Sequence, residues 1–314
     1  MSNRIAVVGS NMVDLITYVT RMPGRGETIE APRFEMGAGG KGANQGVAAA
    51  RLGSEVLMVG KVGDDVFGRN TIANFQRAGI DIRHVGVVAG VSSGVAPIFV
   101  EPSGENSVLI IKGANGHLRP ADVDAAANDL LGCDLILLQL EVPLETVYHT
   151  IAIAARHGKQ VLVNPAPATS ELDLAKLRDV TFLAPNRSEL ALLTGLPTDG
   201  AVAIEMAARR LLDAGIRTVI ATLGSDGLLL VTEAGARHIP AVPVQPVDTT
   251  GAGDAFIGSF AHFYVRSHDV ADALHWAVRY AALSVTQRGT QKSYVDAAAF
   301  REFCARVECG VPPA

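Results

Sequence analysis

The chain has 314 residues, of which 48% are hydrophobic, 5% aromatic and 19% charged, and its formal net charge at pH 7 is −5. This composition excludes a disordered chain and indicates a large core of small aliphatic side chains. The length could hold two domains, although single α/β domains of this size are common. The negative charge argues against nucleic acid as the main partner, because binding to a phosphate backbone normally requires a basic surface.

Short apolar runs alternate with longer amphipathic stretches along most of the chain. The apolar runs predict buried strands over 5–8, 55–59, 135–138, 161–163, 182–184 and 219–222. Helices are predicted between them, over 44–52, 67–78, 120–131, 144–157, 187–193 and 201–215. This alternation predicts a mainly parallel sheet that is covered by helices on both faces.

Two segments, 14–35 and 95–112, depart from this alternation. They lack helical periodicity, are rich in β-branched residues, and carry turn residues at Pro23-Gly24 and at Pro102-Ser103-Gly104. We expect them to form strands of a small separate sheet that is inserted into the α/β core.

A first glycine turn, Gly39-Gly40-Lys41-Gly42, leads into the helix predicted over 44–52. Glycines allow a ligand to approach the backbone closely, and Lys41 and Asn44 can bind a polyhydroxylated ligand. The segment is not a Walker loop, because the spacing of Gly-x-x-x-x-Gly-Lys-Ser/Thr is absent. A helix start with a solvated lysine is the alternative.

A second glycine turn, Val247-Asp-Thr-Thr-Gly-Ala-Gly-Asp254, opens an apolar helical stretch near the C-terminus. The N–H groups at a helix start attract anions, and a carboxylate there can take a proton from a hydroxyl that attacks phosphorus. The alternative is that Asp254 only caps the helix, since Asp is a preferred capping residue. The short string by itself leaves both interpretations open.

Three separated motifs together resemble the ribokinase-like (PfkB) carbohydrate kinases, in the order of that family. They are 39–53, the Asn186-x-x-Glu189 motif and 248–254. The segments 9–15, 93–100 and 139–148 are similar to those of ribokinases, and more so to those of bacterial deoxyribokinases. The resemblance covers nearly all of 1–314 and implies a three-layer α/β sandwich with a mainly parallel central sheet and a small β-sheet lid. It also implies a homodimer that forms through the lids.

The resemblance implies phosphoryl transfer to a sugar. Asp254 would be the base toward the sugar O5, and Gly251, Ala252 and Gly253 would supply the N–H groups of the anion hole. The residues expected to bind the sugar, besides Asp254, are Met12, Asp14, Gly40, Lys41, Asn44 and Glu141.

The resemblance also implies ATP, Mg²⁺ and a monovalent cation. Asn186 and Glu189 would organise Mg²⁺ and the ATP phosphates, although the same pair fits a capping box, and both roles are compatible. The residues expected at the nucleotide, together with Gly253, are Thr222, Leu223, Gly224, Ser225, Asp226 and Gly227; an ordinary turn is the alternative for this loop. Those expected around an activating K⁺ are Asp248, Thr250, Ser284, Gln287, Gly289 and Ser293.

The identity of the sugar depends on Met12. Many bacterial ribokinases have Asn at the position two residues before the sugar-binding Asp, and a thioether cannot usefully hydrogen-bond a hydroxyl. Met12 therefore favours 2-deoxy-D-ribose, with D-ribose as the alternative and a fructokinase or nucleoside kinase as more remote ones. A packed Met at a strand end is the structural alternative for this residue. A non-catalytic sugar-binding regulator would have no reason to retain Asp254.

The three cysteines, Cys133, Cys304 and Cys309, have no metal-ligand spacing. We expect reduced thiols in the cytoplasm. The apolar run at 5–9 is too short for a signal peptide, and none reaches membrane length.

Overall fold

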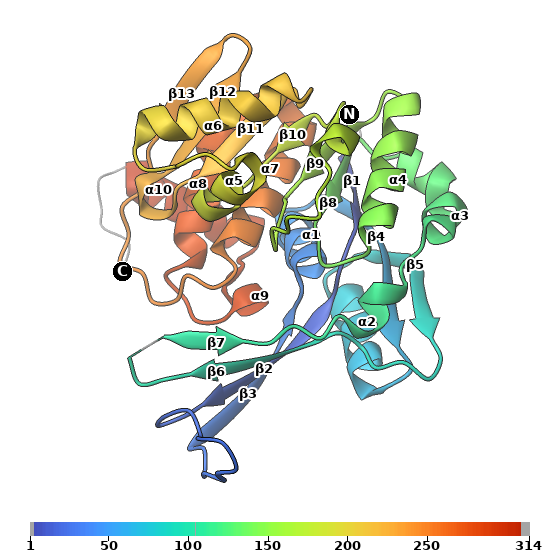
Figure 1. Cartoon of the computed structure of the whole chain (residues 1–314), viewed down its shortest axis with the longest axis vertical. Coiled ribbons are helices and arrows are strands. Elements are labelled where there is room, and N and C mark those ends of the chain that lie inside the picture. The colour runs from blue at the N-terminus through green and yellow to red at the C-terminus, as the bar shows by residue number, and fades with distance from the viewer. Residues whose placement is uncertain (1–2, 104, 309–314) are drawn as a thin grey trace.

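A nine-stranded sheet runs through the computed structural model, which describes residues 3–103 and 105–308 (Figure 1). In spatial order its strands are β13 (Gly235–Ile239), β12 (Leu228–Thr232), β11 (Thr218–Thr222), β10 (Phe182–Leu183), β9 (Gln160–Val163), β8 (Leu135–Leu138), β1 (Arg4–Val8), β4 (Glu55–Gly63) and β5 (Asp81–Val88). All neighbours pair in parallel except β11–β12 and β12–β13. The mainly parallel sheet is confirmed.

The central strand β1 shows why the sheet has helices on both faces. Its residues Ile5 to Val8 are fully buried, and successive side chains point to opposite faces. Ile5 and Val7 join one core cluster, and Ala6 and Val8 join the other. The continuous apolar run therefore anchors two cores.

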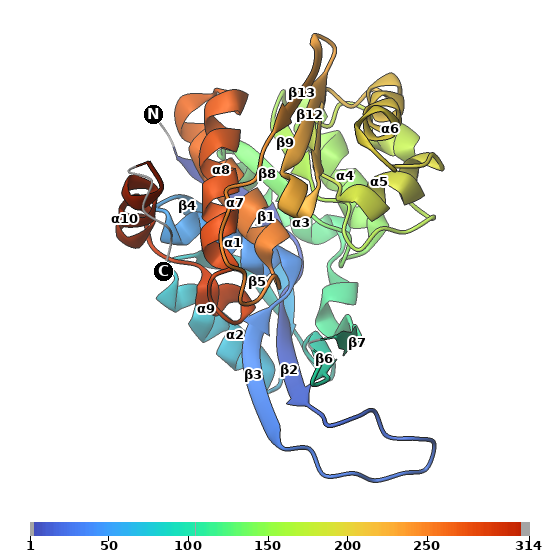
Figure 2. The ribbon, with the colours of Figure 1, turned by 90° about the vertical axis from the view of Figure 1, so that its left-hand side faces the viewer.

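The helices form the outer two of three layers (Figure 2). One core cluster includes residues of α1 (Lys41–Arg51), α2 (Val66–Arg77), α7 (Ala252–Ser267), α8 (Val270–Ser284) and α10 (Ala297–Glu308). The other includes residues of α3 (Pro120–Leu131), α4 (Leu144–Arg156), α5 (Arg187–Thr194) and α6 (Ala201–Asp213). The remaining short helices are α9 (Thr290–Ser293), η1 (Gly113–His117), η2 (Leu174–Leu177) and η3 (Gly224–Asp226). The expected three-layer sandwich is confirmed.

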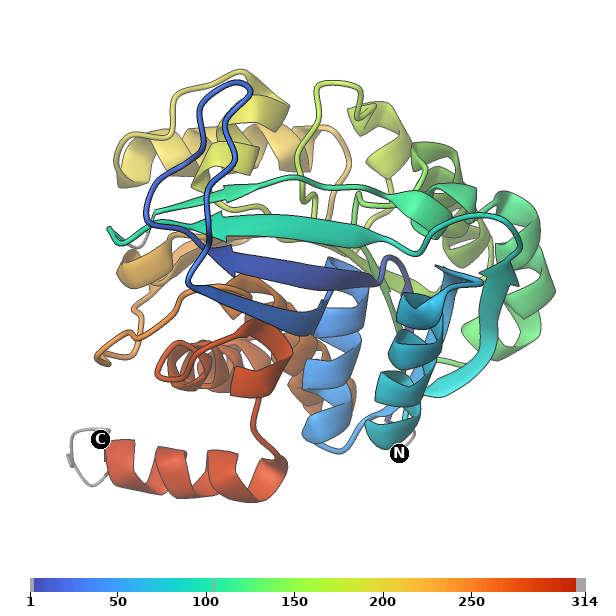
Figure 3. The ribbon, with the colours of Figure 1, turned by 90° about the horizontal axis from the view of Figure 1, so that it is seen from below.

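The expected second sheet projects from one end of the molecule (Figures 1 and 3). Its order is β3 (Arg33–Gly39), β2 (Met12–Tyr18), β6 (Val95–Val100) and β7 (Asn106–Val108). Residues 19–32, however, form a long loop rather than strand. Pro23 and Pro32 cannot donate to a ladder, and Gly26 has a φ of 75°, which favours a turn.

Sequence reasoning missed β5 and the edge hairpin β12–β13. β5 is mainly half-exposed and β13 mainly exposed, so both lack the continuous apolar run that revealed the central strands. Gly104 and Cys309, part of two of the expectations above, lie outside the described residues. Within the described residues, no helix is long and apolar enough to span a membrane.

Candidate functional site

The expected site residues gather at the carboxyl ends of the parallel strands, the usual position of ligand sites in open α/β sheets. Glu141 follows β8, Asn186 follows β10, and Thr222 ends β11. The two glycine turns begin α1 and α7, which pack closely against each other. A Cβ on Gly258 of α7 would lie 2.3 Å from the carbonyl oxygen of Gln45 of α1.

Asp254 is buried where α1 meets α7, with 6% of its surface exposed. Its Oδ2 accepts a hydrogen bond from Asn44 Nδ2 at 2.9 Å, and its Oδ1 accepts one from Gln45 Nε2 at 3.0 Å. Lys41, Asn44 and Gln45 are spaced three and four residues apart, so they share one face of α1. The glycine turn thus aims three polar side chains at one carboxylate.

The start of α7 has the features of an anion pocket. Gly251 has a φ of 78°, and a Cβ there would lie 2.4 Å from Thr290 Cγ2, whereas the space in front of Gly253 is open. Among the described residues, the main-chain N–H groups of Gly251, Gly253 and Asp254 have no acceptor, whereas that of Ala252, which was also expected in the anion hole, donates to the Thr249 carbonyl at 3.2 Å. The alternative that Asp254 caps the helix is wrong, because the N-cap is Gly251 and no side chain caps it.

Two further carboxylates lie near Asp254. Asp14, on β2, lies over the first glycine turn, since a Cβ on Gly39 would be 2.2 Å from Asp14 Oδ1. Burial, together with the negative charges of Glu141 and Asp254, raises the pKa of Asp14 to about 7. Ionised Asp14 therefore destabilises the folded protein, and a ligand that donates hydrogen bonds to the carboxylate can reduce this free-energy cost.

Glu141 is held against the start of α1. Its Oε2 accepts from Ser10 Oγ at 2.5 Å and from the main-chain N–H of Lys41 at 2.9 Å. Burial raises the pKa of Glu141, and the positive charge of Lys41 opposes that rise. Asp254, in turn, raises the pKa of Lys41. Met12 is 3% exposed and pairs with Gly39 in the β2–β3 ladder.

At the start of α5, Asn186 and Glu189 form the expected capping box. Asn186 Oδ1 accepts from the Glu189 N–H, and Glu189 Oε2 accepts from the Asn186 N–H, both at 2.8 Å. Burial raises the pKa of Glu189. Within the described part of the chain, no three His, Cys, Asp or Glu residues form a metal cluster. One carboxylate and an amide fit Mg²⁺, which usually keeps several waters and binds through substrate phosphates.

The loop from Thr222 to Gly227 forms the tight turn of η3 beside this capping box. Thr222 makes an isolated β-bridge with Asn186, and the Gly227 N–H donates to the Gly224 carbonyl at 3.1 Å. Arg187 forms an exposed ion pair with Asp226 at 3.0 Å.

The residues expected around a monovalent cation belong to two segments that lie side by side. Asp248 joins them by accepting from the N–H groups of Thr250 and Gly289, both at 2.9 Å. Burial acts to raise the pKa of Asp248, but these hydrogen bonds hold that pKa below its ordinary value. Ser284 and Ser293 are buried in the same region, and Gln287 is exposed.

The structure adds polar residues that sequence reasoning did not select. They are Ser10, Gln45, Gln139, Asn164 and Gln291. Gln45 could have been found, because it lies one helical turn after Lys41 and beside Asn44. The others have no local signal, since their partners are remote in the sequence.

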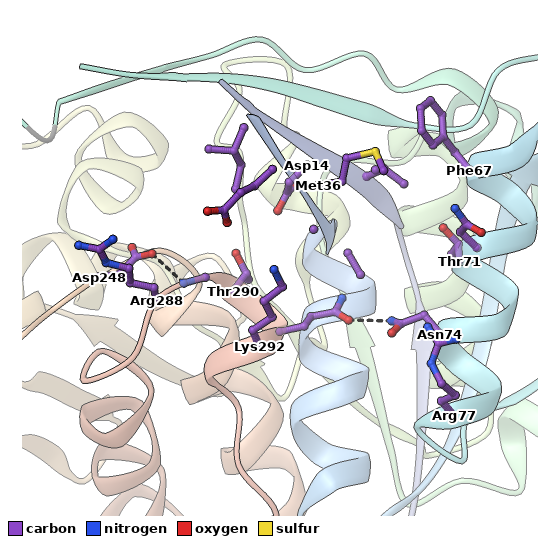
Figure 4. Close-up of a pocket in the computed structure, with 18 of the residues that line it drawn as sticks. Asp14, Met36, Phe67, Thr71, Asn74, Arg77, Asp248, Arg288, Thr290 and Lys292 are labelled. Carbon is purple, nitrogen blue, oxygen red and sulfur yellow. Dashed lines mark hydrogen bonds between the residues drawn. The ribbon is translucent and has the colours of Figure 1, made fainter. Parts of the chain in front are cut away.

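A cavity of about 550 Å³ lies beside the edge strand β3 (Figure 4). The residues that line it come from β2, β3, α2 and the segment 288–292, together with Arg51 of α1 and Asp248. Figure 4 labels Asn74, Arg77 and Lys292 among them. Asp14 also lines this cavity, so the cavity adjoins the group of carboxylates formed by Asp14, Glu141 and Asp254.

Comparisons with known proteins agree with this geometry. A model of the pfkB family carbohydrate kinases matches residues 2–297. A deoxyribokinase of Salmonella typhimurium is 56% identical over 299 residues, covering 95% of this chain and 98% of the relative. A ribokinase of Schizosaccharomyces pombe is 39% identical, with 92% of this chain and 94% of the relative covered.

Solved structures of ribokinases have the same fold. The ribokinase of Thermotoga maritima has a TM-score of 0.88 and 33% identity, and the match covers 96% of this chain and 99% of the other. The ribokinase of Arabidopsis thaliana, complexed with ribose and ATP, has a TM-score of 0.89 and 29% identity with the same coverage.

Proposed function

The chain belongs to the pfkB family of carbohydrate kinases, and we propose that it transfers the γ-phosphoryl group of ATP to the 5-hydroxyl of 2-deoxy-D-ribose. The observation that carries this proposal is the placement of a buried carboxylate, Asp254, beside the unpaired N–H groups that begin α7. The 56% identity to a deoxyribokinase over nearly the whole chain supports the choice of sugar.

In this reaction Asp254 accepts the proton of the sugar 5-hydroxyl while that oxygen attacks the γ-phosphorus of ATP. The bond from phosphorus to the bridging oxygen breaks, and ADP leaves. The N–H groups at Gly253 and Asp254 stabilise the negative charge on the migrating phosphoryl group. Bound Mg²⁺ supplies charge neutralisation at the phosphates, and Glu189 and Asn186 would hold it through its waters.

The sugar hydroxyls would bind in the pocket of Asp14, Glu141 and the first glycine turn. Met12 lies buried against the first glycine turn, and its side chain offers no useful hydrogen bond. A 2-hydroxyl against its thioether would lose water without gaining a partner, which costs about 1–3 kcal/mol. This predicts a preference for 2-deoxy-D-ribose of about tenfold to a few hundredfold. D-Ribose is the second candidate, which the similarity to ribokinases favours.

The test is kcat/KM for both pentoses in the wild type and in Met12→Asn. We expect the wild type to prefer 2-deoxy-D-ribose, and the variant to shift toward D-ribose by about tenfold or more, because Asn can bond the 2-hydroxyl. A wild type that prefers D-ribose would make the chain a ribokinase. An unchanged ratio in the variant would leave Met12 a packing residue.

Activation by K⁺ belongs to the same proposal. The carbonyls of 284–293 and the Asp248 segment would hold the ion, and Tyr294 Oη, which donates to the Gly251 carbonyl at 2.9 Å, links this region to the start of α7. A bound cation would therefore order the anion hole. Equal rates in K⁺ and in a large organic cation would contradict this.

A homodimer through the lids is also proposed. Phe34 and Met36 alternate on β3 and are 55% and 51% exposed, which is unusual for large apolar side chains on one strand face. Charged substitutions there should give a monomer in light scattering, and a wild-type monomer would contradict the proposal.

A cytoplasmic location follows from ATP as donor and can be checked by cell fractionation.

A further inference from the structure

Each carboxylate oxygen of Asp254 ends a separate chain of amide side chains. On the Oδ2 side, Asn44 Nδ2 donates to Asp254, and Asn44 Oδ1 accepts from Gln291 Nε2 at 2.9 Å. Gln291 Oε1 then accepts from Asn74 Nδ2 at 2.8 Å. This arm runs from the base through α1 and α9 to α2, and Asn74 lines the cavity of Figure 4.

On the Oδ1 side, Gln45 Nε2 donates to Asp254 and also contacts Asn164 Oδ1 at 3.2 Å. Gln45 Oε1 accepts from Gln139 Nε2 at 2.6 Å. Gln139 is confined, because a Cβ on Gly9 would lie 2.1 Å from its Oε1. The second arm therefore ends in the interior, against the strand end of β1.

The direction of every bond follows from the carboxylate. An ionised carboxylate only accepts hydrogen bonds, so Asn44 and Gln45 must both present their NH₂ groups to it. Their oxygens then face outward and require donors, which Gln291 and Gln139 supply. Gln45 and Gln139 are fully buried and Gln291 is 5% exposed, so water does not replace a lost partner.

We propose that Gln45 and Gln291 are positioning residues that fix the rotation of the Asp254 carboxylate, with Gln139 and Asn74 holding their amides in the required orientation. The inference rests on the proposed role of Asp254 as the acceptor base. With each oxygen held by one amide, the remaining lone pairs keep a fixed direction toward the sugar hydroxyl. A misplacement of about 1 Å at a reacting group can cost about a hundredfold in rate.

The first test is Gln45→Glu, assayed by kcat against pH at saturating ATP and sugar. The change is nearly isosteric. At low pH the introduced carboxyl is protonated and can still donate to Asp254, whereas at higher pH two carboxylates face each other and repel. We expect kcat of the variant to fall relative to the wild type as pH rises, with the KM for ATP unchanged. Gln76→Glu, an exposed position on α2, adds the same charge elsewhere and should keep the wild-type profile.

The second test is Gln291→Leu, which removes the other arm without adding charge. We expect kcat to fall about ten- to hundredfold, with the KM for ATP unchanged. Asn74→Ala covers the case in which the buried variants do not fold, because Asn74 is only half-buried. It should lower kcat about two- to tenfold by freeing the Gln291 amide. Asn70→Ala, which lies one turn earlier on α2 and lines the same cavity, is its matched control.

The outcomes separate this inference from the proposed function. A wild type without sugar-dependent ATP turnover would overturn the proposed function, and wild-type turnover in Asp254→Asn would show that another group is the base. Loss of turnover in Asp254→Asn, with kcat of Asn74→Ala and folded Gln291→Leu within about twofold of the wild type, would overturn the positioning role alone. An unchanged pH profile in folded Gln45→Glu would overturn it for the Gln45 arm.

Discussion

The sugar side and the nucleotide side of the site are built in different ways. On the sugar side, the buried carboxylates of Asp254 and Glu141 are held by side chains from distant parts of the sequence. On the nucleotide side, Asn186 and Glu189 bond each other within one helical turn, and the loop that ends at Gly227 closes on itself. The groups that do acid–base chemistry therefore depend on the tertiary structure, and the phosphate-binding groups depend mainly on local turns.

This difference has an energetic counterpart. Burial raises the pKa of Asp14, of Glu141 and of Glu189, and the charge of Asp254 acts in the same direction on all three, but only Asp14 is also raised by a second carboxylate, Glu141. Lys41 is the cation among them. We expect substitutions on the sugar side to change chemistry and stability together, and those on the nucleotide side that keep the helix cap to leave stability nearly unaffected.

The largest expected effect is that of Asp254→Asn. An amide has nearly the same shape but cannot take the hydroxyl proton, and general-base catalysis contributes about 10²–10⁴ in rate. We expect kcat to fall by that factor while the KM for ATP stays nearly constant, because the nucleotide loop lies on the other side. Steady-state kinetics at saturating sugar measure both. A kcat within tenfold of the wild type would show that another group is the base.

Sequence reasoning reached the two sides unequally for a physical reason. The capping box at Asn186 and the glycine turn at Gly251 depend on residues that are adjacent in the chain, so their spacing was enough to predict them. The contact of Gln291 with Asn44 joins residues 247 positions apart, and that of Gln139 with Gln45 joins residues 94 apart. No local spacing encodes such contacts.

The same distinction explains the fold. The fully buried strand β1 was predicted from its apolar run, because both of its faces are covered. The edge strands β5 and β13 have one poorly covered face, so their apolar content is diluted by polar residues. The lid was predicted as a separate sheet, but the loop at 19–32 within it was not predicted. A run of β-branched residues does not show where the pairing of two strands stops.

The second prediction concerns Asp14, whose pKa is raised to about 7. Its ionised form is the one that accepts hydrogen bonds from sugar hydroxyls without donating, so we expect kcat/KM for the pentose to fall as pH drops below about 7. Asp14→Asn should remove this pH step and lower kcat/KM about ten- to hundredfold. A wild-type profile that is flat between pH 6 and 8 would contradict this.

Asp14→Asn should also stabilise the protein without its ligands. A carboxyl whose folded pKa is raised loses stability as pH rises from its unfolded value, 3.8, toward about 7, and the loss levels off above that. We expect the free energy of unfolding of the Asn variant to exceed that of the wild type by about 1–3 kcal/mol at pH 8 and by less at pH 5. Its unfolding temperature should rise accordingly. Thermal unfolding at the two pH values, in the absence of sugar, is the measurement. Equal free energies of unfolding of the wild type and the Asn variant at pH 8 would show that ionised Asp14 does not destabilise the folded protein.

The smallest expected effect on stability comes from Glu189→Gln on the nucleotide side. Gln at the third helical position keeps the capping box, so the free energy of unfolding should change by less than about 0.5 kcal/mol. The variant loses the negative charge that would attract Mg²⁺, and we expect the Mg²⁺ concentration for half-maximal rate to rise about tenfold. Asn186→Ala is the contrasting variant, because it removes the cap and should cost about 1 kcal/mol. If Glu189→Gln leaves the Mg²⁺ dependence unchanged, the pair only caps α5, and the metal depends on the phosphates and water alone.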